Sequence, residues 1–273
     1  MTMIEEKPAI VFVRDEISEI IILVSTDKGA FLYFSDADRR HWDVSGPHFM
    51  GSTIHHLVLD PRDDKTLLAS VDSRISGFNI YRSTDFGKSW MPAKKKPEFP
   101  KNNLKRKVNH VFCLQPGNED EKNCWYAGTS PQGLFRSKDG GRNWESMDGF
   151  NNNSNWTKWT NKSPDGYPKI SKLHSILINS TNKDHLYIGM SYGGVFESLD
   201  AGNKWTPINE GIKADHLKGK NIKFGHDPHN VVSHPYKPER LYQQNHYGIY
   251  RLDKPNDKWK RIGDNMPEDI GDI

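Results

Sequence analysis

Five tryptophans divide the chain at similar intervals, from 48 to 61 residues apart, at Trp42, Trp90, Trp144, Trp205 and Trp259. Internal repeats of this length are typical of proteins in which each unit is too small to bury its own apolar face. Such units become stable only when neighbouring copies pack against one another. The spacing therefore predicts a series of similar units, and not a set of unrelated domains.

Each unit contains four short apolar segments. In the third unit they cover 111–116, 124–128 and 133–136, and a fourth begins at Trp144. The same order recurs around Trp205 and Trp259, and an N-terminal unit is built from 10–13, 20–24 and 31–34. Four antiparallel strands per repeat make a β-propeller blade. We predict an all-β fold, one propeller domain over 1–273, with five recognisable blades near 8–50, 51–105, 106–165, 170–222 and 226–273.

Three tryptophans end an intact copy of the pattern Ser-x-Asp-x-Gly-x-x-Trp. Serine and aspartate side chains accept backbone amides within tight turns, and glycine supplies a positive φ. A tryptophan ring packed between blades buries on the order of 200 Å². We interpret these residues as structural: Ser83, Asp85, Gly87 and Trp90; Ser137, Asp139, Gly141 and Trp144; Ser198, Asp200, Gly202 and Trp205. A degenerate copy at 35–42 has Ala37 and Arg39 at the Asp and Gly positions.

On these copies the chain resembles the Asp-box (BNR) repeat β-propellers, a broad group that includes sialidases and sortilin-like receptors. Segments 35–40, 173–177 and 241–246 are similar to soluble prokaryotic members described as glycosyl-hydrolase-like. The resemblance implies that the box is the hairpin between the third and fourth strands of a blade. The five repeats are either a complete ring or part of a ring of six or seven blades.

The composition limits the class of protein. Apolar residues make up 34% and aromatic residues 11%, and the aromatic share excludes extended disorder. A net charge of +3 argues against a nucleic-acid partner, and we interpret the basic loop 94–107 as solvated surface.

The start of the chain has neither the basic nor the apolar region of a signal peptide, and charged residues interrupt the apolar stretch 10–24. We therefore expect a cytoplasmic protein without membrane contact. Two cysteines do not make a disulfide framework, and we expect Cys113 and Cys124 to be free, buried thiols.

Long connections fall at 91–109, 145–173 and 206–228. If strands alternate in direction, all three lie at the face opposite the Asp boxes, which we call the loop face. Long loops on a rigid scaffold commonly carry function, so we expect any site there.

Four histidines have similar positions near the loop face. His55, His110 and His229 each lie six residues before a proline, and His174 lies six residues before Ser180 in the same slot. Equivalent positions in successive blades would surround the mouth of a central channel, with His246 beside them. Converging imidazoles bind divalent transition metals, so these four are candidate ligands. Two alternatives remain open: histidines that hydrogen-bond between strands, and a site for an organic or anionic ligand.

Aromatic residues also lie in the loops of this face. Trp156 and Trp159 can stack on sugar rings, or they can pack as a lid. With Tyr192 and His246, which follow second strands, they are the candidate ligand-binding residues.

A classical sialidase is not supported. It needs three arginines around a carboxylate, but Arg82, Arg136 and Arg251 directly precede the boxes and belong to the opposite face. Asp215 and Asp227 are loop-face carboxylates without a distinguishing pattern, and no catalytic residue is assigned. We expect a scaffold that binds a small molecule, glycan or protein. The alternative is a glycoside hydrolase, a lyase or a metal-dependent enzyme that uses the channel-mouth histidines.

Overall fold

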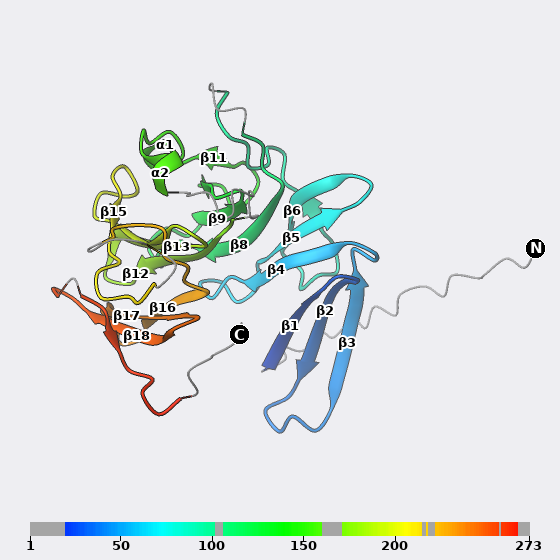
Figure 1. Cartoon of the computed structure of the whole chain (residues 1–273). Helices are drawn as coiled ribbons and strands as arrows, with labels where there is room; N and C mark the ends of the chain where they lie inside the picture. The colour runs from blue at the N-terminus through cyan, green and yellow to red at the C-terminus, as the bar shows by residue number, and fades with distance from the viewer. Residues whose placement is uncertain are drawn as a thin grey trace, which may run out of the picture. The chain divides into compact units, whose positions relative to one another are not determined.

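The computed structural model describes residues 20–101, 106–159, 171–214, 217, 222–256 and 258–266 (Figure 1). The chain divides into two compact units, 1–93 and 94–273, which we call unit 1 and unit 2 and describe separately. The regular secondary structure of the described residues consists of antiparallel strands and two four-residue helices. None of these helices is long and apolar enough to cross a membrane.

Unit 1 contains two sheets. The first has three strands in the order β1-β2-β3, and the predicted segment 10–13 lies outside the described residues. The second has four strands in the order β4-β5-β6-β7. The strands are β1 (Ile20–Thr26), β2 (Gly29–Ser35), β3 (Trp42–His48), β4 (Thr53–Leu59), β5 (Leu67–Ser73), β6 (Gly77–Ser83) and β7 (Met91–Pro92).

Unit 2 contains three four-stranded sheets, each a meander of sequential strands (Figure 1). The first comprises β8 (His110–Pro116), β9 (Trp125–Ser130), β10 (Leu134–Ser137) and β11 (Glu145–Ser146). The second comprises β12 (Leu173–Asn179), β13 (Asn182–Met190), β14 (Gly194–Ser198) and β15 (Thr206–Pro207). The third comprises β16 (Asn230–His234), β17 (Lys237–Asn245), β18 (Gly248–Asp253) and β19 (Lys260–Arg261).

These sheets confirm the predicted all-β blades. In four sheets the outermost strand is two residues long and begins one residue after the repeat tryptophan. The two helices, α1 (Asp148–Asn151) and α2 (Trp156–Trp159), were not predicted and follow β11 in the second long connection.

The Asp box forms the expected hairpin. Ser137 Oγ donates to Asp139 Oδ1 over 2.8 Å and accepts the Gly141 amide over 2.9 Å. Asp139 also accepts the backbone amides of Arg142 and Asn143. The copies that begin at Ser83 and Ser198 repeat the two contacts of Ser137: the hydroxyl donates to the box aspartate and accepts the amide of the box glycine. The turn chemistry accounts for these residues, as their structural interpretation requires.

The core of unit 2 lies between consecutive sheets. One cluster combines side chains of the first and second sheets, and another combines those of the second and third. Trp144, Trp205 and Trp259 are buried within this unit. In unit 1, Trp90 is half-buried, and Trp42, which ends the degenerate box, is 36% exposed.

Glycines on second strands allow this close packing. A Cβ built at Gly128 lies 2.4 Å from the backbone oxygen of Leu173 on the next sheet. At the corresponding Gly189, it lies 2.6 Å from Cγ2 of Val231. Both predicted thiols are free and buried, and burial raises the pKa of Cys113 to about 12.

Candidate functional site

The first strands of two sheets, β4 and β12, have a register shift near their start. In β4 the ladder skips His55 between Ile54 and His56, and in β12 it skips His174 between Leu173 and Ser175. An extra residue of this kind is a β-bulge, which redirects side chains at the end of a strand. The bulge places His55 and His174 at equivalent positions of their sheets.

His110 does not share this position. In β8 the skipped residue is Phe112, between Val111 and Cys113, while His110 pairs with Ser130. The expected equivalence of four histidines is therefore wrong for His110. The reason is that β8 remains paired as far as Pro116, whereas β4 stops at Leu59, before its proline. Counting six residues back from Pro116 therefore gives His110, which lies two residues before Phe112, the residue at the bulge.

The imidazole of His174 lies where the second and third sheets of unit 2 are in contact. Its Nδ1 lies 2.9 Å from Ser175 Oγ, which accepts the Val231 amide over 3.1 Å. Burial lowers the pKa of His174 to about 3, so its imidazole is neutral at physiological pH. These contacts agree with the structural alternative for this histidine. In unit 1, His55 Nε2 lies 3.8 Å from Asp72 Oδ2.

His229 belongs to a different group, formed with Asp227 and His246. One side-chain ligand atom of each lies within 4.8 Å of the others. The two imidazole rings meet edge to face, with 4.2 Å between their centroids. Asp227 and His229 are half-buried, whereas His246 is exposed. His229 and His246 lie close together, as expected, and the Asp227 carboxylate is a third member of the group that was not expected there.

Backbone contacts hold this group in place. The His229 amide donates to the carbonyl of Gln244 at the end of β17. Asp227 Oδ1 accepts the amide of Tyr192 over 3.2 Å, so Tyr192 lies beside the group. His246 occupies the β17–β18 turn, in which Asn245 Oδ1 accepts the Tyr247 amide over 2.8 Å.

The two candidate tryptophans have different surroundings. Trp159 is 5% exposed and stacks on Phe150 in the core. Trp156 is half-buried; its indole donates to the carbonyl of Gln132, and the Arg106 guanidinium lies 4.2 Å from its ring centroid. Arg106 also lies over Phe99, at 4.5 Å. Trp156 thus keeps a partly accessible ring, while Trp159 belongs to the core cluster between the first and second sheets of unit 2.

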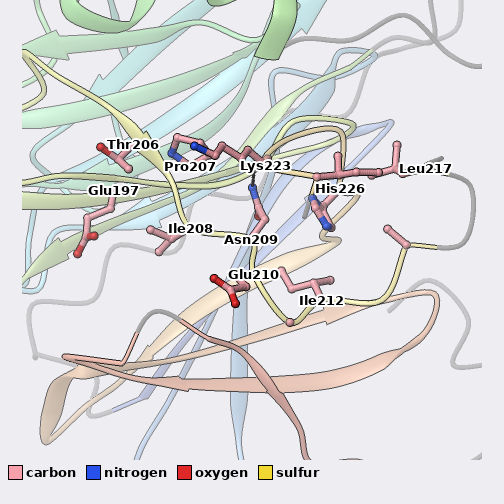
Figure 2. A pocket seen from close by; sticks show the side chains of 13 residues that line it. Glu197, Thr206, Pro207, Ile208, Asn209, Glu210, Ile212, Leu217, Lys223 and His226 are labelled. Atoms are coloured by element: carbon pink, nitrogen blue, oxygen red, sulfur yellow. Dashed lines mark hydrogen bonds between the residues drawn. The ribbon is translucent and has the colours of Figure 1, made fainter. Parts of the chain in front are cut away.

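A cavity of about 460 Å³ is lined largely by the described residues of the third long connection (Figure 2). Asn209 crosses it: Nδ2 donates to the Lys223 carbonyl over 2.8 Å, and Oδ1 accepts the Val195 amide. Polar groups of Glu197, Glu210 and His226 line it together with Ile208, Ile212, Leu217 and Ile222. Sequence reasoning missed this cavity because its wall comes from a loop without periodicity.

Comparisons with known proteins agree on the fold. The BNR-Asp box repeat family matches residues 80–92, which include the intact box from Ser83 to Trp90. The fold is therefore a β-propeller that carries a BNR-Asp box repeat. No curated protein sequence matches it significantly.

Three solved structures resemble this propeller. The GH74 xyloglucanase from Xanthomonas campestris is 16% identical over 88% of this chain and 43% of its own, with a TM-score of 0.52. The extracellular domain of a B. thetaiotaomicron protein is 14% identical over 93% and 28%, with a TM-score of 0.55. The COPII outer coat vertex is 12% identical over 88% and 57%, with a TM-score of 0.51. The propeller therefore spans less than two thirds of each chain, and the likeness concerns the fold alone.

Proposed function

We propose that this propeller is a binding scaffold that holds a small molecule, glycan or protein segment on the loop face of unit 2. The observation that carries this proposal is the cavity of about 460 Å³ lined by residues of 206–214, 217 and 222–226. Ligand sites usually enclose about 300–1,000 Å³ and combine apolar walls with a few polar groups. The propeller provides the scaffold, and the loop supplies the variable surface.

The wall chemistry indicates the class of ligand. Ile208, Ile212 and Ile222 give an apolar surface, and Glu210, Lys223 and His226 offer charged or hydrogen-bonding groups. A ligand with an apolar face and several hydroxyl or amine groups fits this mixture. Sugars and small polar metabolites have this character.

A ligand panel tests the proposal. Oligosaccharides and metabolites are screened by thermal shift, because a ligand that binds only the native state raises Tm. Ala214 lines the cavity, so Ala214→Trp is expected to abolish the shift by filling the space. Ile262→Trp, at a position 45% exposed, is the matched control. Shifts that persist in Ala214→Trp would contradict binding in this cavity.

A glycosidase that used this cavity, and not the channel-mouth histidines, would need two carboxylates, and Glu197 and Glu210 line it. A general acid needs a raised pKa. Burial opposes ionisation of Glu197, but hydrogen bonds from His185 and Lys254 lower its pKa overall. This favours a binding role. Turnover in a glycoside panel that disappears in Glu210→Gln would establish the enzyme instead.

We also propose that residues 1–273 form one propeller domain. One domain predicts a single calorimetric transition, with equal calorimetric and van't Hoff enthalpies. Two separated transitions would contradict it. A cytoplasmic location is a further proposal, supported by the buried free thiols Cys113 and Cys124.

A further inference from the structure

We propose that Asp227, His229 and His246 bind a divalent transition-metal ion, with Zn²⁺ as the reference metal. The proposal goes beyond the binding scaffold and does not depend on a ligand in the cavity. It also differs from the four-histidine set expected from sequence, of which it keeps only His229.

The donor set has the chemistry and the spacing of such a site. Two imidazoles and one carboxylate suit Zn²⁺, Fe²⁺ and related ions. Metal–ligand bonds of about 2.0–2.2 Å place donor atoms roughly 3.3–3.6 Å apart in tetrahedral geometry. The atoms of this group already lie within 4.8 Å of one another. His246 is exposed, so rotation of its side chain can close the remaining distance.

The surrounding backbone holds the ligands in place. Asp227 is fixed at one oxygen by the Tyr192 amide, which leaves the other oxygen for an ion. His229 is fixed through its amide at the first residue before β16, opposite Gln244. The three ligands thus come from a loop, a strand start and a facing turn. Supporting contacts of this kind commonly change metal affinity by about 10–100-fold.

Three protein ligands leave a coordination position for water or for another molecule. This arrangement is characteristic of catalytic and ligand-exchanging metal sites, whereas structural zinc sites are closed by four protein ligands. The exposed side at His246 gives an ion access from solvent. His226, which lines the cavity, directly precedes Asp227 in the chain. An ion at this site would therefore lie beside the wall of the proposed ligand cavity.

The four-histidine alternative has less support. His174 Nδ1 contacts Ser175 Oγ where two sheets meet. His110 lies two residues before Phe112, the residue of β8 that corresponds to His174 in β12. The two sets share His229, so a His229 variant does not distinguish them. His246 and Asp227 belong only to the proposed set, whereas His110 belongs only to the alternative.

The experiment measures Zn²⁺ binding by titration calorimetry and metal content after dialysis, on the full chain without a histidine tag. We expect one equivalent of Zn²⁺, with affinity reduced at least about 100-fold in His246→Gln and Asp227→Asn. Co²⁺ is expected to give the visible absorption of a four-coordinate site, and this absorption should be absent in the same variants. Asp227→Asn retains the acceptor for the Tyr192 amide, so a loss of metal there reports the charge.

His41→Gln, at an exposed histidine of unit 1, is the control and should bind as the parent protein does. Three outcomes would overturn the proposal: an absence of stoichiometric Zn²⁺ binding, binding unchanged in His246→Gln and Asp227→Asn, or a loss caused by His110→Gln instead. Unchanged thermal unfolding of the metal-free variants excludes misfolding as the cause of a loss.

Discussion

Glu197 and Lys254 form an ion pair, with 2.8 Å between Oε2 and Nζ, that joins two consecutive sheets of the propeller. Their side chains are 11% and 14% exposed. His185 Nε2 lies 2.9 Å from the other carboxylate oxygen, so both oxygens of Glu197 have partners. The pair is thus one of several polar contacts at the boundary between these two sheets, together with the bond from Asn179 Nδ2 to Glu239 Oε1.

Removal of either partner is expected to destabilise unit 2. Lys254→Met leaves a largely buried carboxylate short of a donor, at a cost of about 1–3 kcal/mol. Urea unfolding measures this, and Lys204→Met, at an exposed lysine, is the control. The double variant with Glu197→Gln should lose less than the sum of the single losses. Strict additivity would show that the pair contributes nothing through direct interaction.

The second prediction concerns acid stability and Asp139. Burial opposes its ionisation, but hydrogen bonds from Asn143, Ser137 and the Arg142 amide lower its pKa below 3.8. The unfolded state therefore takes up a proton first as pH falls. The stabilisation by Asp139 is complete above the unfolded pKa and disappears as pH falls through the folded value. Unfolding free energies between about pH 5 and pH 2 should fall less steeply in Asp139→Asn. Parallel profiles would contradict this role.

The third prediction concerns the serine of the box. Ser137→Ala removes the acceptor of the buried Gly141 amide and the donor to Asp139. Leaving a buried amide unsatisfied costs about 1–3 kcal/mol, which chemical denaturation can measure. Ser89→Ala removes an exposed hydroxyl that also contacts a box aspartate, and it should cost less. Equal losses at the two serines would show that burial of the Gly141 amide is unimportant.

Most of the fold follows from sequence because the box and the strand pattern are local. Ser137, Asp139 and Gly141 lie within five positions and make their own turn, so their chemistry can be inferred without tertiary information. Trp144 follows at a fixed distance and reaches the core. The short helices escaped prediction because α1 and α2 are single turns without amphipathic periodicity.

The candidate site was only partly predictable, because it depends on register and on loops. Counting from proline identified His229 but displaced His110, since the length of the β8 ladder is not visible in sequence. His246 was expected near His229 from the strand pattern alone. The sequence shows Asp227 as a loop carboxylate, but its proximity to His229 and His246 depends on tertiary structure. Its place two residues before His229 was the one available signal.

The last prediction concerns the glycines at the boundary between sheets. A Cβ at Gly128 would lie 2.4 Å from Leu173 O and 2.7 Å from Cys113 Sγ, and the first of these is a backbone atom that cannot rotate away. Gly128→Ala is therefore expected to push the sheets of unit 2 apart. Overpacking of this kind costs about 1–3 kcal/mol or more.

Gly189→Ala gives a second measure, because its Cβ would meet Val231 Cγ2 at 2.6 Å and His174 Cε1 at 3.2 Å. These are side-chain atoms, which can yield in part, so we expect a smaller loss than at Gly128. Gly263→Ala is the control, since its nearest neighbours would lie at 3.6 Å, an ordinary contact. Urea unfolding should rank the three variants in the order Gly128, Gly189, Gly263, from most to least destabilised. A loss at Gly263 equal to that at Gly128 would contradict close approach of consecutive sheets as the reason for glycine, because Gly→Ala without a steric conflict lowers the entropy of the unfolded chain and is not expected to destabilise.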